Sequence, residues 1–553
     1  MWSLLVTLCA VFGASRAWYY GRPDPGEMTQ GGVWPLPWKL DYENTTHLLN
    51  PAHFEFVSDL DCDILRSAFV RYKKLAFPGG SIASSIIPSL RSIKVSVKNG
   101  CPSGYPQMGM DESYSLTVVR RSDVAVLEAN EVWGALRGLE TFSQLVYRPP
   151  TSANVFFLRC ATVEDHPRFP HRGIMIDTVR HFWSVPIILR NIDLAAQNKF
   201  NTLHWHLTDS EAFPYESKRY PELAQKGAYT NKHVYSRSDV RRVIDFARLR
   251  GIRVVAEFDS PGHFGAWGKG RPELLSKCFD REGNPSVLPN IFDPSKKENF
   301  DFLQAFFEEA LHVFPDQYMH FGGDEVASSM LECWYRNPEV RTWMNSNGYG
   351  NDTNAVLKDY FKKLVQMVQS SRNDTKMIFW QEVLDMNVAP SNSIAHVWKG
   401  DTYADIMKEM NEVTKNGHYA ILSSCWYLNY IKYGADWGYV PAEHNRERGL
   451  YYECNPTDFG GSEAQNNLVL GGEAVMWSEF VDGTNIISRF WPRASAPAER
   501  LWSDLAQTQS ADKAWPRLHE HRCRMMARGY PVEPPNNPDY CNDFWNPDYP
   551  DLE

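Results

Sequence analysis

Residues 173–209 read GIMIDTVRHFWSVPIILRNIDLAAQNKFNTLHWHLTD, which is the pattern of a strand, a helix and a second strand. The two strand segments, 173–177 and 202–206, are short and apolar, whereas 185–197 repeats its apolar residues at helical spacing. Parallel strands need a long crossover connection, and a helix is the usual one. The stretch therefore predicts one β-α-β unit of a parallel sheet.

The same alternation continues toward the C-terminus, with further helical segments at 238–249 and 299–313. Six more apolar, β-rich segments complete a set of eight, at 252–257, 318–321, 377–380, 394–397, 419–423 and 469–474. Eight such units predict an α/β fold, a (β/α)8 TIM barrel catalytic domain with insertions, over residues 166–510. A doubly wound sheet is the structural alternative, but it usually carries a Gly-rich phosphate loop early in the domain, and this sequence shows none.

A smaller domain precedes the barrel. Segments 93–97 and 115–119 alternate like half-buried strands and 133–146 has helical spacing, so residues 18–165 predict an α+β domain. The stretch DHPRFP at 165–170 breaks regular structure and marks the boundary. Residues 511–553 predict a C-terminal helix and a Pro-rich tail that is closed by a disulfide at Cys541.

Composition and charge exclude several classes of function. The 553 residues, 43% hydrophobic and 13% aromatic, can build a large core in two or three domains. The 57 basic and 67 acidic residues give a net charge of −10, which argues against broad electrostatic binding of nucleic acid. No segment after the N-terminus is long and apolar enough to predict a transmembrane helix. The nineteen tryptophans suit the apolar faces of sugar rings, although core filling is the simpler explanation for any one of them.

The N-terminus predicts entry into the secretory pathway. Residues 1–17 have the short apolar run and the small residues before a cleavage site that are typical of a signal peptide, although no Lys or Arg precedes the run. Glycosylation sequons begin at three asparagines, Asn44, Asn351 and Asn373. We therefore expect a lysosomal or secreted protein.

The cysteines fit an oxidising compartment. Cys9 lies in the expected signal peptide, and the remaining cysteines form no CxxC pair, which disfavours a zinc knuckle. Proximity along the chain favours three disulfides: Cys62–Cys101, Cys278–Cys333 and Cys523–Cys541. Cys160, Cys425 and Cys454 stay unassigned, and the odd number leaves at least one free thiol.

The ends of the expected barrel strands are where the active site of such a barrel lies. An ionisable or aromatic group follows every one of the eight strands, in the segments 177–180, 204–209, 257–263, 320–325, 380, 398, 426–427 and 477–479. The sequence HFGGDE ends in two adjacent carboxylates, Asp324 and Glu325, after two glycines that let the backbone approach a ligand closely. One of two carboxyl groups can protonate a glycosidic oxygen if negative charge and an apolar wall raise its pKa. Adjacent Asp and Glu residues are common on solvated loops, so the catalytic interpretation depends on their position at the end of a barrel strand.

A metal site is the alternative at the second strand. Alternation places His204 and His206 on one face, as two zinc ligands on a strand would require. A metal-dependent amidohydrolase on a similar barrel would use both histidines.

Six motifs carry a resemblance to a known family: RGIMIDTVRHF at 172–182, NTLHWHLTDS at 201–210, EFDSPGHFGAWG at 257–268, HFGGDEV at 320–326, CWYLN at 425–429 and GGEAVMWSEFVD at 471–482. Together they resemble the β-N-acetylhexosaminidases of glycoside hydrolase family 20, and most closely the animal lysosomal enzymes. The resemblance extends from about Val33 to Cys541. It implies an exo-glycosidase that removes terminal non-reducing β-linked GlcNAc or GalNAc from a glycan, without metal or cofactor, and that forms a homodimer.

The resemblance also implies a substrate-assisted retaining mechanism, in which the acetamido oxygen of the sugar attacks C1. The nucleophile is tethered beside the carbon, which gives it a high effective concentration. Glu325 would be the general acid and then the base, Asp324 would orient the acetamido group, and Tyr427 would donate to its oxygen. Asp209 and His263 would tune Glu325.

The same resemblance assigns the sugar-binding residues: Trp380, Trp398 and Trp477 as pocket walls, Arg180 and Glu479 on the 3- and 4-hydroxyls, and Asn429 on the 6-hydroxyl. The sequence departs from the family at Ser210, where a second Asp is common, and at Tyr430, where members that accept anionic sugars have Arg. A catalytically silent glycan-recognition protein is the other alternative. The intact Asp324, Glu325 and Tyr427 argue against it.

Overall fold

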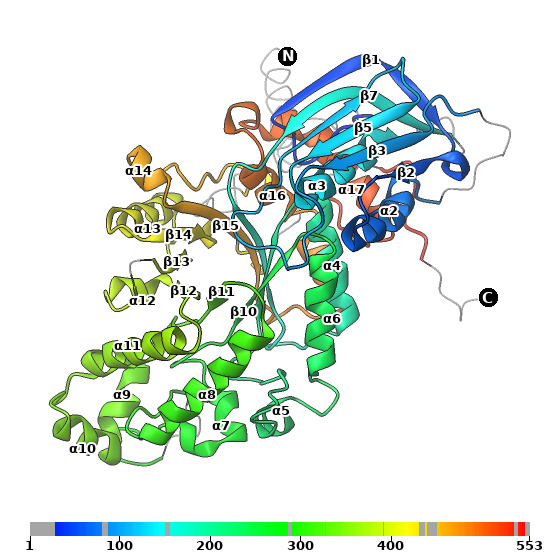
Figure 1. Cartoon of the computed structure of the whole chain (residues 1–553). Helices are drawn as coiled ribbons and strands as arrows, with labels where there is room; N and C mark the ends of the chain where they lie inside the picture. Colours follow the sequence, from blue (N-terminus) through cyan, green and yellow to red (C-terminus); the bar gives the residue numbers. More distant parts are fainter. Residues whose placement is uncertain are drawn as a thin grey trace, which may run out of the picture.

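The computed structural model describes residues 28–79, 87–149, 155–285, 290–326, 328–390, 392–430, 437–438, 451–535 and 540–547. The expected signal peptide at 1–17 lies outside these ranges. Two hydrophobic cores organise the described residues, one in an N-terminal α+β domain and a larger one in a barrel domain (Figure 1).

The N-terminal domain is built on a seven-stranded sheet with the order β1-β7-β4-β5-β3-β2, and β6 pairs with β7. Its strands are β1 (Lys39–Leu49), β2 (Glu55–Val57), β3 (Ser92–Val97), β4 (Tyr114–Val118), β5 (Val124–Ala129), β6 (Val146–Tyr147) and β7 (Phe156–Asp165). Helices α2 (Asp63–Ala76) and α3 (Val132–Leu145) form one core with the buried alternate residues of these strands. Residues of α3 are buried on every side. The opposite face of the sheet carries the half-exposed residues of the alternating pattern.

The barrel domain contains eight parallel strands that close in the order β8 to β15. They are β8 (His171–Asp177), β9 (Thr202–His206), β10 (Arg253–Glu257), β11 (Tyr318–His320), β12 (Lys376–Trp380), β13 (Ile394–Val397), β14 (Tyr419–Leu422) and β15 (Val469–Met476). Each strand lies within two residues of the bounds expected from the sequence, so the TIM-barrel prediction is confirmed.

Helices surround the barrel strands, as Figure 1 shows. The longer ones are α4 (Val185–Gln197), α6 (Arg237–Arg248), α8 (Lys297–Val313), α11 (Thr353–Ser371) and α13 (Tyr403–Lys415). The shorter ones are α5 (Glu222–Gly227), α7 (Gly265–Gly270), α9 (Ser328–Arg336), α10 (Pro338–Ser346), α12 (Gln381–Asp385), α14 (Glu463–Asn466), α15 (Ile486–Phe490) and α16 (Ser495–Trp502). The start of α6 is fixed by a capping box between Ser236 and Asp239.

The N-terminal domain docks at the amino ends of the first barrel strands. Glu112 accepts hydrogen bonds from Arg137 of α3 (2.8 Å), Arg172 of β8 (2.6 Å) and Asn201, which precedes β9 (3.0 Å). Arg137 also donates to the carbonyl of Gly251, just before β10 (2.8 Å). The contact therefore leaves the carboxyl ends of these strands uncovered by the N-terminal domain.

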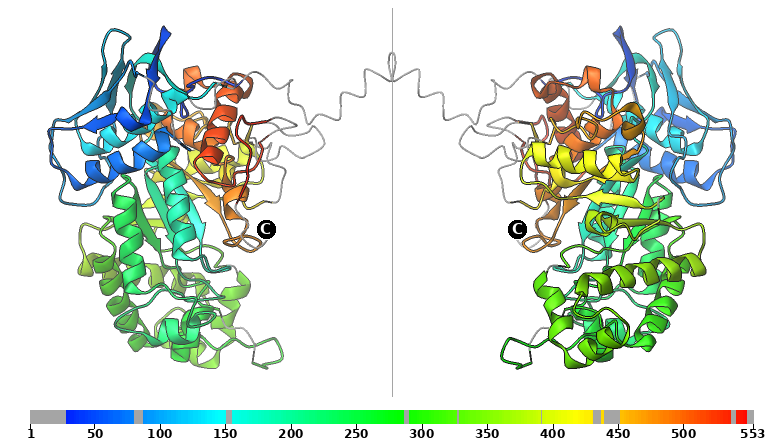
Figure 2. Two further views of the ribbon diagram at one scale, coloured as in Figure 1. Left: turned by 90° about the vertical axis from the view of Figure 1, so that its right-hand side faces the viewer. Right: turned by 90° about the vertical axis from the view of Figure 1, so that its left-hand side faces the viewer.

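The C-terminal helix α17 (Ala511–Ala527) joins the two units. Its Glu520 accepts from the backbone N–H of Gly31 at 2.8 Å, and its Arg524 donates to the carbonyl of Gln144 at the end of α3. On the barrel side, His521 lies 3.0 Å from Asn198, which caps α4. Figure 2 shows this helix, coloured red, at the junction between the N-terminal sheet and the barrel.

Four disulfides are present among the described residues. Three are the expected pairs, Cys62–Cys101, Cys278–Cys333 and Cys523–Cys541. The fourth, Cys425–Cys454, connects the segment after β14 to the one before β15 and was not assigned from the sequence. Cys160 is a free thiol that is buried on β7.

The three sequon asparagines, Asn44, Asn351 and Asn373, are all exposed. Asn44 lies where the pairing of β1 with β7 is interrupted between Tyr42 and Thr46. Within the described ranges, none of the helices combines the length and the apolar content that a bilayer-crossing segment needs.

Candidate active site

The parallel barrel brings the expected site residues to one end, because each follows the carboxyl end of a strand. Arg180 follows β8, Asp209 follows β9, His263 follows β10, Asp324 and Glu325 follow β11, and Trp380 ends β12. Trp398 follows β13, Tyr427 and Asn429 follow β14, and Trp477 and Glu479 follow β15.

A tight glycine turn carries the two adjacent carboxylates. Gly322 and Gly323 have φ angles of +65° and +96°, which favour glycine, and Glu325 also has a positive φ of 53°. The turn lies against Asp259, whose Oδ1 accepts from the N–H of Gly323 at 2.8 Å. A Cβ atom on Gly322 would lie 1.8 Å from that oxygen. Close packing and backbone conformation therefore both require the glycines that precede Asp324.

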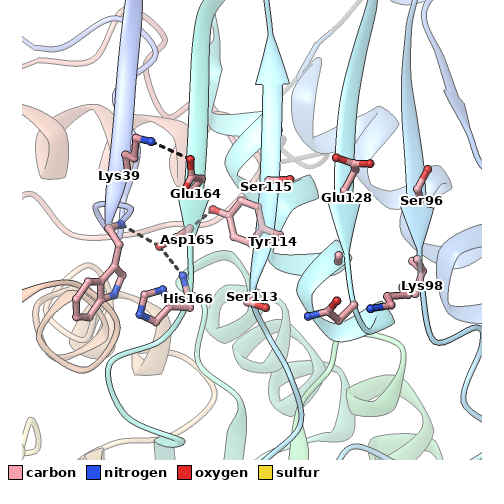
Figure 3. Close-up of a pocket in the computed structure, with 14 residues that line it drawn as sticks. Lys39, Ser96, Lys98, Ser113, Tyr114, Ser115, Glu128, Glu164, Asp165 and His166 are labelled. Atoms are coloured by element: carbon pink, nitrogen blue, oxygen red, sulfur yellow. Dashed lines mark hydrogen bonds and ion pairs between the residues drawn. The ribbon is translucent and has the colours of Figure 1, made fainter.

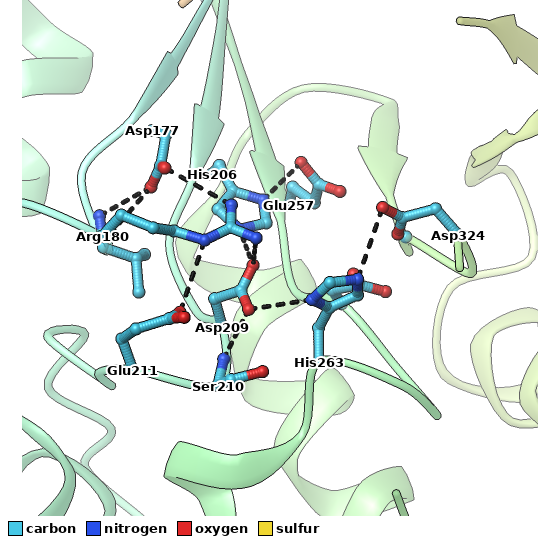
Figure 4. Close-up of polar contacts among 12 residues, drawn as sticks. Asp177, Arg180, His206, Asp209, Ser210, Glu211, Glu257, His263 and Asp324 are labelled. Atoms are coloured by element: carbon cyan, nitrogen blue, oxygen red, sulfur yellow. Dashed lines mark hydrogen bonds and ion pairs between the residues drawn. The ribbon is translucent and has the colours of Figure 1, made fainter. Parts of the chain in front are cut away.

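His263 lies between Asp209 and Asp324, as Figure 4 shows, and it also contacts Glu325. Its Nδ1 is 3.0 Å from Asp209 Oδ1, and its Nε2 is 3.4 Å from Glu325 Oε2 and 3.7 Å from Asp324 Oδ2. Asp209 also accepts from Arg180, with Nη2 at 2.7 Å. The His263 ring therefore lies within 3.7 Å of three carboxylates, and one of these, Asp209, also contacts the guanidinium of Arg180.

The opposite charges around His263 stabilise one another. Burial raises the pKa of Asp209, but His263 and Arg180 outweigh it and hold that pKa well below its usual range. Burial likewise lowers the pKa of His263, while Asp324 and Asp209 raise it well above 6.5. A buried imidazolium paired with carboxylates is the state that these contacts favour.

The two carboxylates differ in exposure and in acidity. The side chain of Asp324 is 12% exposed and burial raises its pKa, whereas the side chain of Glu325 is 59% exposed and contact with His263 lowers its pKa. The expectation that the proton donor has a raised pKa is therefore wrong for Glu325 in the free protein. The physical reason is that Glu325 is half in water and faces an imidazolium.

Four aromatic side chains lie at the same end of the barrel as these carboxylates, around the expected sugar site. Tyr427 packs with Met175 and Val475, and both Trp398 and Trp477 pack against this cluster. The ring centroid of Trp380 lies 6.0 Å from that of Trp477. The Nε1 of Trp380 donates to Glu257 at 2.9 Å, and that of Trp398 donates to Glu382 at 3.0 Å. Hydrogen bonds at the indole edges thus fix how these two rings face the space.

The expected hydroxyl-binding residues lie around the same space with different burial. Arg180 is mostly buried, and its guanidinium carbon is 4.9 Å from the Trp477 ring centroid. Glu479 is exposed and Asn429 is half-buried. Tyr430 is exposed, with its ring 6.1 Å from that of Tyr427. Glu479 and Tyr430 are therefore more open to solvent than Arg180 and Asn429.

Comparison with known proteins identifies the family. A model of the glycosyl hydrolase family 20 catalytic domain matches residues 169–505, which is more than half of the chain. A second model, described as beta-acetyl hexosaminidase like, matches residues 33–145. The chain belongs to glycoside hydrolase family 20.

Two relatives and one solved structure illustrate the similarity to family 20. Beta-hexosaminidase A of Caenorhabditis briggsae is 48% identical over 540 residues, 97% of each chain. Human beta-hexosaminidase subunit beta is 42% identical over 528 residues, 92% of this chain and 89% of that protein. The chitobiase structure of Flavobacterium johnsoniae aligns with a TM-score of 0.74 at 26% identity, covering 91% of this chain and 74% of that one. The activity is accordingly exo-hydrolysis of terminal β-linked N-acetylhexosamine, and a substrate-assisted mechanism is typical of the family.

The two histidines of the metal alternative serve an ion-pair network in this family 20 barrel. His206 lies between Glu257 (2.8 Å) and Asp209 (3.0 Å). His204 lies between Glu257 (2.9 Å) and Glu473 (2.8 Å). All four ring nitrogens thus face a carboxylate oxygen, which disfavours their use as metal ligands.

Sequence reasoning missed two acidic residues that support the family 20 site. Glu257 underlies Trp380, and Asp259 anchors the glycine turn. Both belong to the EFDSPGH motif, and the alternation along β10 could have indicated that Glu257 points inward. Nothing in the sequence indicated which partners these two carboxylates meet.

A groove of about 850 Å³ lies away from the barrel, on the outer face of the N-terminal sheet (Figure 3). Its rim includes the stacked rings of Trp38 and His166, with centroids 4.4 Å apart. Lys39 is paired with Glu164 at 2.8 Å, and Asp165 accepts from the N–H of Trp38. These pairings satisfy a solvated sheet face, and the chemistry of the family lies at the barrel end.

Proposed function

We propose that Glu325 is the general acid and base, and Asp324 the partner of the substrate acetamido group, in hydrolysis of a terminal β-linked N-acetylhexosamine. The observation that carries this assignment is the placement of His263 within 3.7 Å of both carboxylates, at the carboxyl end of the barrel and beside a tryptophan-lined space. A shared imidazolium gives the two adjacent carboxylates different acidities, which is what two different roles require.

The reaction begins when the acetamido oxygen attacks C1 and Glu325 donates its proton to the departing glycosidic oxygen. The bond from C1 to that oxygen breaks as an oxazolinium ring closes. Asp324 accepts a hydrogen bond from the acetamido N–H and stabilises the positive charge that develops on it, and Tyr427 donates to the attacking oxygen. Glu325 then takes a proton from water, which opens the ring and leaves the sugar with its original anomeric configuration.

Glu325 becomes protonated when the sugar binds. A sugar over the half-exposed side chain removes water from the carboxylate, and desolvation favours the neutral acid. After it has donated this proton, Glu325 is ionised, which is the form that takes a proton from water in the second step.

The sugar lies between the three tryptophans Trp380, Trp398 and Trp477 in this proposal. Arg180 and Glu479 hold the 3- and 4-hydroxyls. Contacts of 2.7 Å with Asp209 and 3.4 Å with Asp177 hold the guanidinium in place. Asn429 faces the 6-hydroxyl, and Asp209 and His263 tune Glu325.

We further infer a homodimer that is glycosylated and delivered to the lysosome or secreted. Several relatives are named as subunits of beta-hexosaminidase, which supports assembly. Four disulfides and three exposed sequon asparagines are typical of proteins that mature in an oxidising compartment. Light scattering of the purified protein before and after glycosidase treatment tests the assembly and the glycosylation, and a monomer without glycans would contradict both.

The test of the acid is Glu325→Gln, which keeps the shape but cannot donate a proton. We expect a loss of about 10²–10⁴-fold on a disaccharide, whose leaving group is poor, and a smaller loss in the first step on an aryl glycoside. The two substrates control for each other in one variant. Equal and slight losses on both would refute the assignment of Glu325.

A further inference from the structure

Glu257 is a wholly buried carboxylate beneath the sugar pocket, at the end of β10. Its Oε1 accepts from the indole N–H of Trp380 at 2.9 Å. Its Oε2 meets ring nitrogens of His206 at 2.8 Å and His204 at 2.9 Å. Both oxygens are therefore held by groups on neighbouring strands, and the mechanism above leaves this residue without a role.

A chain of charged contacts leads from Glu257 to the catalytic groups. His206 contacts Asp209 at 3.0 Å, and Asp209 contacts Arg180 at 2.7 Å and His263 at 3.0 Å. Figure 4 shows these links together, with the His206 ring between the carboxylates of Glu257 and Asp209. A single carboxylate thus lies one contact from a pocket wall, two contacts from Asp209, and three contacts from Arg180 and His263.

The chain also leads away from the site. His204 contacts Glu473 on β15 at 2.8 Å, and Glu473 contacts His171 on β8 at 2.7 Å. Burial lowers the pKa of His204, but Glu473 and Glu257 outweigh it and raise the pKa to about 9. Imidazole rings and carboxylates therefore alternate along the barrel interior, and each of these buried carboxylates contacts at least one imidazole nitrogen.

We propose that Glu257 is a positioning residue for the sugar pocket, with Oε1 fixing the indole plane of Trp380 and Oε2 fixing Asp209 through His206. An indole can rotate about its side-chain torsions, and one hydrogen bond at its N–H selects the orientation in which its face meets the sugar. Glu257 thereby fixes the position of Trp380 relative to Asp209, which lies beside the groups around Glu325. This inference rests on the pocket roles proposed above for Trp380 and Asp209.

The chain supplies a matched control in Glu473. This residue is equally buried and belongs to the same network, and its described contacts are His171, His204 and His396. Glu473→Gln therefore removes a buried charge from the network without touching Trp380 or His206. A purely structural role of the network predicts equal effects of the two changes.

The experiment compares Glu257→Gln with Glu473→Gln in the full-length protein, with KM and kcat measured on an aryl N-acetylglucosaminide. A displacement of about 1 Å at a reacting centre can cost about 100-fold, so we expect a fall of that order in kcat/KM for Glu257→Gln, with KM raised. For Glu473→Gln we expect a fall of less than about tenfold, because Glu473 reaches Glu257 only through His204. Equal losses in the two variants would overturn the proposal.

Trp380→Phe keeps a ring but removes the N–H, so it tests the same link from the other side, and its KM alone decides if Glu257→Gln does not fold. We expect Trp380→Phe to raise KM, and we expect Glu257→Gln to cost less in that background than in the wild type. An unchanged KM, or additive losses, would overturn the proposal. Trp380→Ala distinguishes a failure of the proposed pocket from a failure of the proposed role of Glu257. A wild-type KM for Trp380→Ala refutes the pocket. A raised KM, together with equal effects of the two glutamate variants, refutes only the role of Glu257.

Discussion

Replacing Gly323 with alanine changes both the backbone conformation and the packing of the turn that carries the catalytic pair. The residue has a φ of +96°, and a Cβ atom would lie 2.4 Å from Val383 Cγ2 and 3.0 Å from Phe361 Cζ. The left-handed backbone costs an L-residue about 1–2 kcal/mol. Forcing a methyl group into a packed core adds about 1–3 kcal/mol. We therefore expect the free energy of unfolding to fall by about 2–5 kcal/mol, with the turn moving to relieve the contact.

Gly348→Ala is the matched control, because Gly348 has a φ of +81° and a Cβ atom there would meet nothing within 4 Å. It should cost only the backbone term, about 1–2 kcal/mol, and leave kcat unchanged. Denaturant unfolding and kcat on an aryl N-acetylglucosaminide, measured for both variants, separate strain from packing. For Gly323→Ala a shift of the pair by about 1 Å predicts a fall in kcat of about 100-fold. Equal stability and equal kcat in the two variants would refute the argument that close packing positions the pair.

Three other predictions follow from the site. Because His263 lowers the pKa of Glu325 and the acid must be protonated, His263→Gln should move the basic limb of kcat/KM to higher pH; an unmoved or lower limb in the pH profile would contradict this. Tyr430→Arg should raise the ratio of activity on 6-sulfo-GlcNAc to that on GlcNAc aryl glycosides by about tenfold, because one charge-assisted contact is added, and a constant ratio would count against it. Peptide mapping without reduction should recover Cys425 linked to Cys454 and Cys160 unmodified by any partner, whereas a Cys160 disulfide would show that the pairing is wrong.

The barrel could be predicted from the sequence because its strands are buried on both faces. Each strand is then a short apolar run between helical segments, as at 202–206 and 394–397, and the repeat of this pattern indicates the topology. The same topology predicts that Asp324, His263 and Asp209 converge, because parallel strands place their carboxyl ends together.

The acidity of Glu325 could not be predicted in the same way. It depends on the distance from His263 Nε2 and on how much water reaches the carboxylate, and both are set by side-chain positions in three dimensions. The link from Glu257 to Trp380 is hidden for a similar reason, because the two residues lie on strands separated by β11 in the barrel. The Cys425–Cys454 pair was not assigned from the sequence, although the expected boundary at 165–170 already placed Cys160 in the N-terminal domain, because the closeness of Cys425 and Cys454 is set by the fold.

The central claim is that the acetamido oxygen of the substrate is the nucleophile, with Asp324 and Glu325 serving it. Aryl glycosides in which the acetyl group carries none, one, two or three fluorines test this most directly, because each fluorine withdraws electrons from the carbonyl oxygen. We expect kcat/KM to fall with each fluorine that is added. A flat series, or a sugar found covalently attached to Asp324 or Glu325 by mass spectrometry, would contradict it.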